Sequence, residues 1–143
     1  MHLLALIIWL GLCALHDLTQ RKISNALTFG GLVAALLCLA LTGKSFIGAS
    51  PLAAVGAFAL ALVVTLPGYA LKRLGAGDVK MLAALGLATD IKLLLYSWAI
   101  ACVSQVALYV LGRYLPRFVL AQRTPFAPFV LLGFCLSALL LTN

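Results

Sequence analysis

Long apolar stretches constrain this chain more than any other feature. A membrane-spanning helix needs about 20 predominantly apolar residues. Five stretches approach that requirement and a sixth is short; in chain order they are 3–15, 26–42, 52–71, 79–88 (the short one), 93–111 and 126–142. Hydrocarbon offers the backbone no hydrogen-bond partner, so such stretches are helices, and the alternation of a membrane β-strand is missing. The sequence predicts an all-α integral membrane protein, a bundle of six transmembrane helices with a short fourth helix.

The composition agrees with a membrane-embedded chain. Of 143 residues, 65% are hydrophobic and only 9% are charged, and the mean hydropathy of +1.20 is far above that of a soluble domain. The connections between apolar stretches are short, so we expect a single membrane domain over residues 1–143. The first stretch is read as a span and not as a signal peptide, because it has no basic leading region beyond His2 and no small-x-small cleavage site.

Basic residues indicate the orientation in the membrane. If all six stretches cross, the first, third and fifth loops share one side and hold eight Lys and Arg, namely Arg21, Lys22, Lys72, Arg73, Lys80, Arg113, Arg117 and Arg123. The other side holds Lys44 and Lys92. A re-entrant fourth stretch would weaken this asymmetry. The positive-inside rule therefore predicts six crossings, with those three loops in the cytoplasm and both termini outside. It also explains the net charge of +7 without a nucleic-acid partner.

Two of the three acidic residues fall on that cytoplasmic side. Asp17 ends the first stretch, where a carboxylate meets the negative end of the helix dipole, so it does not cap its own helix. Its D-x-x-Q spacing to Gln20 also fits a capping box for a short following turn. Asp90 lies at the far end of the fourth stretch and is excluded as a partner.

Asp78 lies in the sequence GAGDVK, just before the fourth stretch. On its own it reads equally well as an N-cap. Gly75 and Gly77, however, permit close approaches that side chains forbid, as an extended peptide beside a carboxylate requires. Ionisable residues at membrane spans are functional hypotheses by default.

Together, Asp17 and Asp78 predict an aspartic dyad. Two neighbouring carboxylates share one proton. The ionised member takes a proton from water while the protonated member polarises a scissile carbonyl. Other chemistry has little support: the two histidines have no visible Ser or Cys partner, the chain has no glutamate, and the four cysteines form no CxxC pair. We expect neither a metal nor a cofactor.

Three motifs carry a resemblance to a known family. Asp17 followed by RKISN, then GAGDVKMLAALG, then TPFAPFVLLG at the last stretch resemble the type IV prepilin peptidases, in particular the short forms associated with Tad (Flp) pili. The resemblance implies a bacterial inner-membrane aspartic endopeptidase. Such an enzyme cuts the leader from prepilins or pseudopilins, just before their hydrophobic helix, on the cytoplasmic side.

Carried onto this sequence, the resemblance gives Asp17 and Asp78 as the catalytic pair, with Gly75 and Gly77 supporting the second aspartate. Asn25 is expected either to order the active-site loop or to N-cap the second helix. Lys80 is expected either to contact substrate or to extend to the membrane interface. Longer family members carry an insertion with paired cysteines and also methylate the new N-terminus. Here the first connection is short, so peptidase activity alone is expected.

Two other functions remain open. A different G-x-G-D intramembrane protease would cut a helix within the bilayer, although here both aspartates lie at the ends of spans. A non-catalytic membrane assembly or transport subunit would use Asp17 and Asp78 as caps or ion ligands. The sequence does not indicate an oligomeric state.

Overall fold

The computed structural model describes residues 2–114 and 125–142, and these residues form six helices with no strand among them. The helices are α1 (His2–Gln20), α2 (Asn25–Thr42), α3 (Pro51–Ala70), α4 (Ala76–Ala88), α5 (Ile91–Tyr114) and α6 (Ala127–Thr142). The all-α prediction is confirmed. Arg117 and Arg123, which were counted for the topology, lie outside the described residues.

Capping residues set several helix boundaries. Ser24 is the N-cap of α2, and its side chain accepts a hydrogen bond from the backbone nitrogen of Ala26. Asn25 is therefore the first helical residue, and its predicted role as the N-cap was wrong. The first helix runs on to Gln20, so only residues 21–24 connect α1 to α2.

Four helices are long and apolar enough to cross a membrane: α1, α2, α3 and α5. Helix α6 is apolar but shorter, with 16 residues. Helix α4 has 13 residues, a length of about 20 Å against about 30 Å of hydrocarbon. The described chain is thus a multi-pass helical membrane protein, while the crossing of all six helices stays a prediction.

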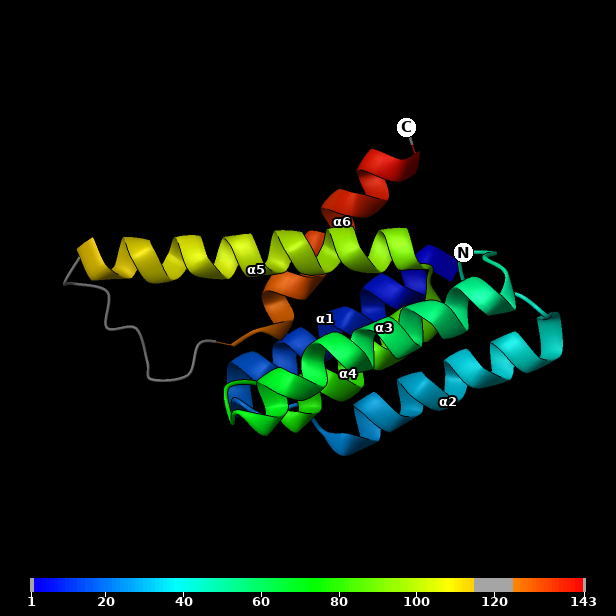
Figure 1. The fold of residues 1–143 in the computed structure, drawn as a ribbon, viewed down its shortest axis with the longest axis horizontal. Coiled ribbons are helices and arrows are strands. Elements are labelled where there is room, and N and C mark those ends of the chain that lie inside the picture. The colour runs from blue at the N-terminus through cyan, green and yellow to red at the C-terminus, as the bar shows by residue number, and fades with distance from the viewer. Residues whose placement is uncertain (1, 115–124, 143) are drawn as a thin grey trace.

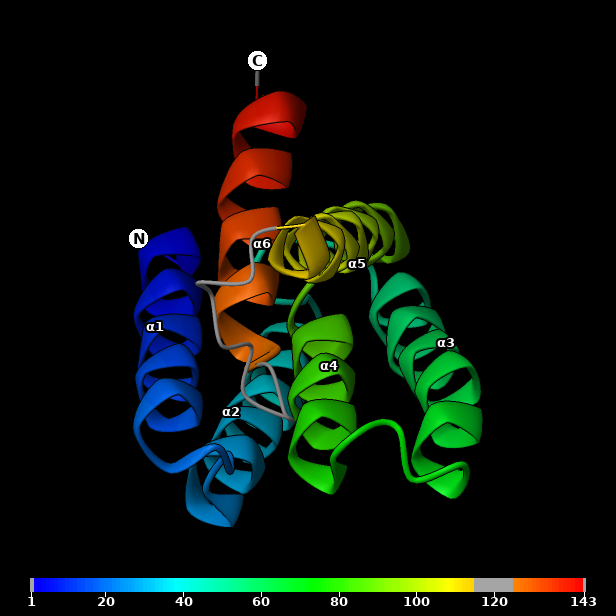
Figure 2. The ribbon, with the colours of Figure 1, turned by 90° about the vertical axis from the view of Figure 1, so that its left-hand side faces the viewer.

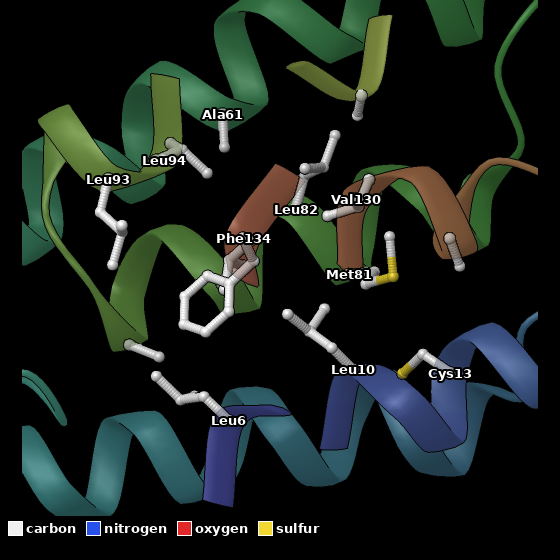
Figure 3. Packing of buried hydrophobic residues seen from close by; sticks show 14 of the residues in the cluster. Leu6, Leu10, Cys13, Ala61, Met81, Leu82, Leu93, Leu94, Val130 and Phe134 are labelled. Atoms are coloured by element: carbon white, nitrogen blue, oxygen red, sulfur yellow. The ribbon is translucent and has the colours of Figure 1, made fainter. Parts of the chain in front are cut away.

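Helix α4 is short, and other helices cover most of it. Its residues from Met81 to Ala88 are all buried, as expected for a helix that is apolar on every face. It packs closely against α3, where Ala54, Ala57 and Ala61 are buried. A Cβ atom added to Gly86 would lie 2.8 Å from the carbonyl oxygen of Ala57, so only glycine allows this approach. Figure 3 shows Met81 and Leu82 of α4 among core side chains from α1, α5 and α6.

The helices alternate in direction, and this alternation brings three helix ends together. The C-terminal end of α1 and the N-terminal ends of α4 and α6 lie at the left of Figure 1, the end toward which α5 also runs. Figure 2 looks onto this end and shows α4 between α2 and α3, with α6 beside α1. The connection from α4 to α5, which contains Asp90, lies at the opposite end of the bundle.

Candidate active site

A cleft of about 1240 Å³ opens where these helix ends meet. Asp17 from α1 and Asp78 from α4 both line it, together with Gly75. The other walls come from the end of α3, from one face of α5, and from Pro125 and Phe126 before α6. The structure therefore places the two sequence-predicted aspartates in one cleft.

Asp17 is held at the junction of two helix ends. Its side chain is only 7% exposed, and its Oδ2 atom accepts a hydrogen bond of 3.0 Å from the backbone nitrogen of Ala127, the first residue of α6. The predicted capping box with Gln20 was wrong, because α1 continues through Gln20. The carboxylate instead satisfies a free N–H at the start of α6, where the positive helix end favours an anion.

Asp78 lies in the first turn of α4, outside the four helices of spanning length. The N-cap of α4 is Gly75, so the predicted N-cap position of Asp78 was wrong; its Oδ2 atom accepts a hydrogen bond of 3.2 Å from the Gly75 nitrogen. The pKa of Asp78 is raised from 3.8 to about 6, mainly because burial disfavours the charged form and secondly because the Asp17 carboxylate repels it. The Gly75 hydrogen bond opposes this rise. The charge of Asp17 is thus one of the causes of the raised pKa of Asp78.

The two glycines are required by close approaches. The backbone of Gly75 has φ −76° and ψ 147°, which any residue adopts, but a Cβ atom there would lie 2.9 Å from Oδ2 of Asp78. A Cβ atom on Gly77 would lie 3.0 Å from Cβ of Ile23, in the connection between α1 and α2. Gly75 thus leaves room for the carboxylate, and Gly77 lets α4 pack against that connection.

Asn25 and Lys80 lie outside the cleft lining and contact each other. Lys80 Nζ donates a hydrogen bond of 3.0 Å to Oδ1 of Asn25 and lies 5.5 Å from the ring centroid of Phe29, within the range of a cation–π interaction. These contacts join α2 to α4. They give Lys80 structural partners on α2, Asn25 and Phe29.

Several cleft residues were missed by the sequence analysis. Helix α5 contributes Cys102, Gln105 and Tyr109, and α3 contributes Tyr69. On α5 these residues follow the three-and-four spacing of a single helix face, but only the packing of α5 beside α6 shows that this face borders the cleft. The Ala127 N–H was also missed, because a backbone donor carries no sequence signal.

Three basic side chains also line the cleft. Arg21, Lys72 and Arg73 line the cleft and are exposed. Arg21 and Lys72 have left-handed backbones, with φ of 52° and 56°, and each follows the end of a helix, where such a residue commonly reverses the chain. Among the described residues, no three His, Cys, Asp or Glu side chains are grouped closely enough to hold a metal ion.

Fold and cleft define a class of protein: a multi-pass helical membrane protein with two aspartates, Asp17 and Asp78, in one cleft. Residues 4–111 match the type IV leader peptidase family. The chain therefore belongs to this family, and its membership indicates a peptidase. The match includes Asp17 and Asp78 and ends before α6. No curated protein and no solved structure matches the chain.

Proposed function

We propose that this protein is an aspartic endopeptidase of the bacterial inner membrane that removes the leader peptide of type IV prepilins of the Flp/Tad kind. Asp17 and Asp78 are its catalytic dyad, and the cleft faces the cytoplasm with both termini outside. The observation that carries the proposal is that both aspartates line one cleft; the raised pKa of Asp78, to which the Asp17 carboxylate contributes, supports it. A pair that shares a proton is what hydrolysis by two aspartates requires.

The roles of the two aspartates follow from their surroundings. Asp78 holds the shared proton and donates a hydrogen bond to the scissile carbonyl oxygen. Asp17 takes a proton from the attacking water, whose oxygen bonds to the carbonyl carbon. The resulting intermediate breaks its C–N bond, and the leaving amine receives a proton from the dyad.

The substrate side of the proposal rests on the resemblance and on the position of the cleft. The cleft is lined by the ends of α1 and α3, by the start of α4 and the residues before α6, and by one face of α5. A cleft next to so many helix ends suits an extended peptide beside the membrane better than a helix within it. Prepilins and pseudopilins, cut just before a hydrophobic helix, fit this geometry. Only residues 21–24 separate α1 from α2, which leaves no room there for the cysteine-bearing insertion of methylating relatives, so we assign peptidase activity without N-methylation.

The test is cleavage of a Flp-type prepilin by the purified protein in liposomes. Wild type is compared with Asp17→Asn and Asp78→Asn, and with Asp90→Asn as the matched control. Asp90 accepts a hydrogen bond of 2.8 Å from the Leu93 nitrogen at the other end of the bundle. Wild type and Asp90→Asn should release the leader, and both dyad variants should be inactive. Equal cleavage by all four proteins would refute the dyad.

A second candidate is a non-catalytic assembly or transport subunit, and one observation favours it. Each aspartate accepts a hydrogen bond from a backbone N–H at the start of a helix, Asp17 from Ala127 and Asp78 from Gly75. Asparagine accepts the same hydrogen bond but cannot cycle a proton. Under this candidate the Asn variants keep the ability to support pilus assembly in cells, whereas a peptidase loses it.

A further inference from the structure

The N-terminal end of α6 provides the group that orients Asp17. Asp17 sits in the last turn of α1, where the free carbonyl groups of that helix repel a carboxylate. The hydrogen bond that the described chain gives this carboxylate comes from Ala127, 110 positions away in sequence. Two helix ends of opposite polarity therefore meet at one buried side chain.

This hydrogen bond occupies only one carboxylate oxygen. Oδ2 is bound to the Ala127 nitrogen, which leaves Oδ1 without a hydrogen bond from the described residues. A hydrogen bond to one carboxylate oxygen favours the rotamer that makes it, and thereby favours one direction for the other oxygen. Pro125 and Phe126, immediately before Ala127, line the same cleft, so the segment that fixes Asp17 also forms a wall of the site.

We infer that Ala127 is a positioning residue, whose backbone N–H holds Oδ2 of Asp17 so that Oδ1 faces the attacking water. This inference rests on the proposed function, and it adds a group from outside the family-matched residues 4–111. The donor acts on Asp17 and not on substrate. Its loss should therefore affect the chemical step more than substrate binding.

Proline is the substitution that removes this donor with least disturbance. Ala127 is the first residue of α6, and proline is favoured at the first helical position because the missing N–H makes no hydrogen bond within the helix. The matched control is Ile91→Pro, which places proline at the first position of α5. That position lies at the opposite end of the bundle. Ala127→Gly is the conservative variant, since it keeps the N–H.

We expect Ala127→Pro to lower kcat for prepilin cleavage by about 10- to 100-fold, the loss that corresponds to one hydrogen bond to a charged group. KM should stay within about threefold of the wild-type value. Ile91→Pro measures the effect of the proline itself on the thermal midpoint, and any further decrease in Ala127→Pro should be no larger than the loss of one buried hydrogen bond explains. Ala127→Gly should retain far more of the wild-type kcat than Ala127→Pro.

An unchanged kcat in Ala127→Pro, with an active wild type, would overturn the inference and leave the proposed function intact. If the wild-type protein fails to cleave an authentic prepilin, the proposed function itself is refuted. If Ala127→Pro unfolds, replacing Ala127 by lactic acid decides the matter, because the ester lacks the N–H but keeps the shape of the backbone. A wild-type kcat in that variant also overturns the inference.

Discussion

Lys80 donates a hydrogen bond of 3.0 Å to Asn25 and thereby ties the helix that carries Asp78 to the first residue after the α1–α2 connection. Asn25 and Lys80 are 55 positions apart in sequence. Neither residue lines the cleft, so their effect on catalysis is expected to pass through the relative placement of α2 and α4.

This contact predicts non-additive effects of mutation. Asn25→Ala and Lys80→Met should each lower prepilin cleavage by about two- to tenfold, since each removes one hydrogen bond. The double variant should be no worse than the more damaging single variant, because partners in contact share one interaction energy. Cleavage rates of the four proteins measure this coupling. Lys92→Met, a lysine at the far end of the bundle, is the control, and additive losses would show that Asn25 and Lys80 act independently.

The raised pKa of Asp78 predicts how activity depends on pH. Under the proposed function, protonated Asp78 hydrogen-bonds the scissile carbonyl, and the pKa of Asp78 is raised to about 6. We therefore expect kcat/KM to fall as the pH rises through about 6, because this parameter reports the free enzyme. At low pH the activity should fall again as the dyad gains its second proton, giving a bell-shaped profile. A profile that is flat between pH 5 and 8 would contradict this assignment of the proton.

The same pKa predicts that Asp78 reduces the stability of the fold at neutral pH. A carboxyl group whose folded pKa lies above its unfolded value of 3.8 binds more protons in the folded state between the two values. The free energy of unfolding therefore decreases as the pH rises from about 4 to about 6, and it decreases no further above that range because Asp78 is then ionised in both states. Asp78→Asn should raise the free energy of unfolding above pH 6 by about 2 kcal/mol.

Thermal unfolding in detergent at pH 7.5 and pH 4 measures this effect. The gain of Asp78→Asn should be present at pH 7.5 and disappear at pH 4. Asp90→Asn should show no comparable gain, because it removes a carboxylate that caps the start of α5 through the Leu93 nitrogen. A gain of equal size at both pH values would mean that the charge of Asp78 is not its cause.

A side chain at Gly75 should displace the Asp78 carboxyl group. A methyl group there would lie 2.9 Å from Oδ2 of Asp78, so the carboxyl group turns away and loses its hydrogen bond from the Gly75 nitrogen. We expect Gly75→Ala to lower kcat by about three- to tenfold, the loss of one hydrogen bond. Gly30→Ala is the matched control, because a Cβ atom on this α2 glycine would have no neighbour within 4 Å. Equal rates for the two variants would show that the absence of a side chain at Gly75 is not needed to position the Asp78 carboxyl group.

Much of this architecture is readable from sequence because apolar stretches and caps are local signals. Hydropathy located all six helices, including the short α4, within a few residues of their ends. The errors occurred where a local sequence pattern is compatible with more than one helix-capping arrangement. Ser24 and Asn25 are both good caps, and the chain uses Ser24. The D-x-x-Q pattern at Asp17 is overridden because α1 gains another turn and Asp17 finds Ala127 instead.

The candidate site was only partly predictable for the same reason. Asp17, Asp78 and Gly75 stand out because charge and glycine are rare within apolar sequence, and all three line the cleft. Tyr109 and Cys102 do not stand out, since aromatic and small residues are common along α5. Their place at the cleft depends on how α5 crosses α6, which is a tertiary property.

The position of α4 inside the bundle makes the site depend on the whole chain. A helix of 13 residues is short for a bilayer crossing, and most of its residues are buried where it packs against α2 and α3. Asp78 therefore takes its position from those two helices, whereas Asp17 is hydrogen-bonded to the Ala127 nitrogen at the start of α6. Under the proposed function, both halves of the site are in place only once this C-terminal helix has folded against α1.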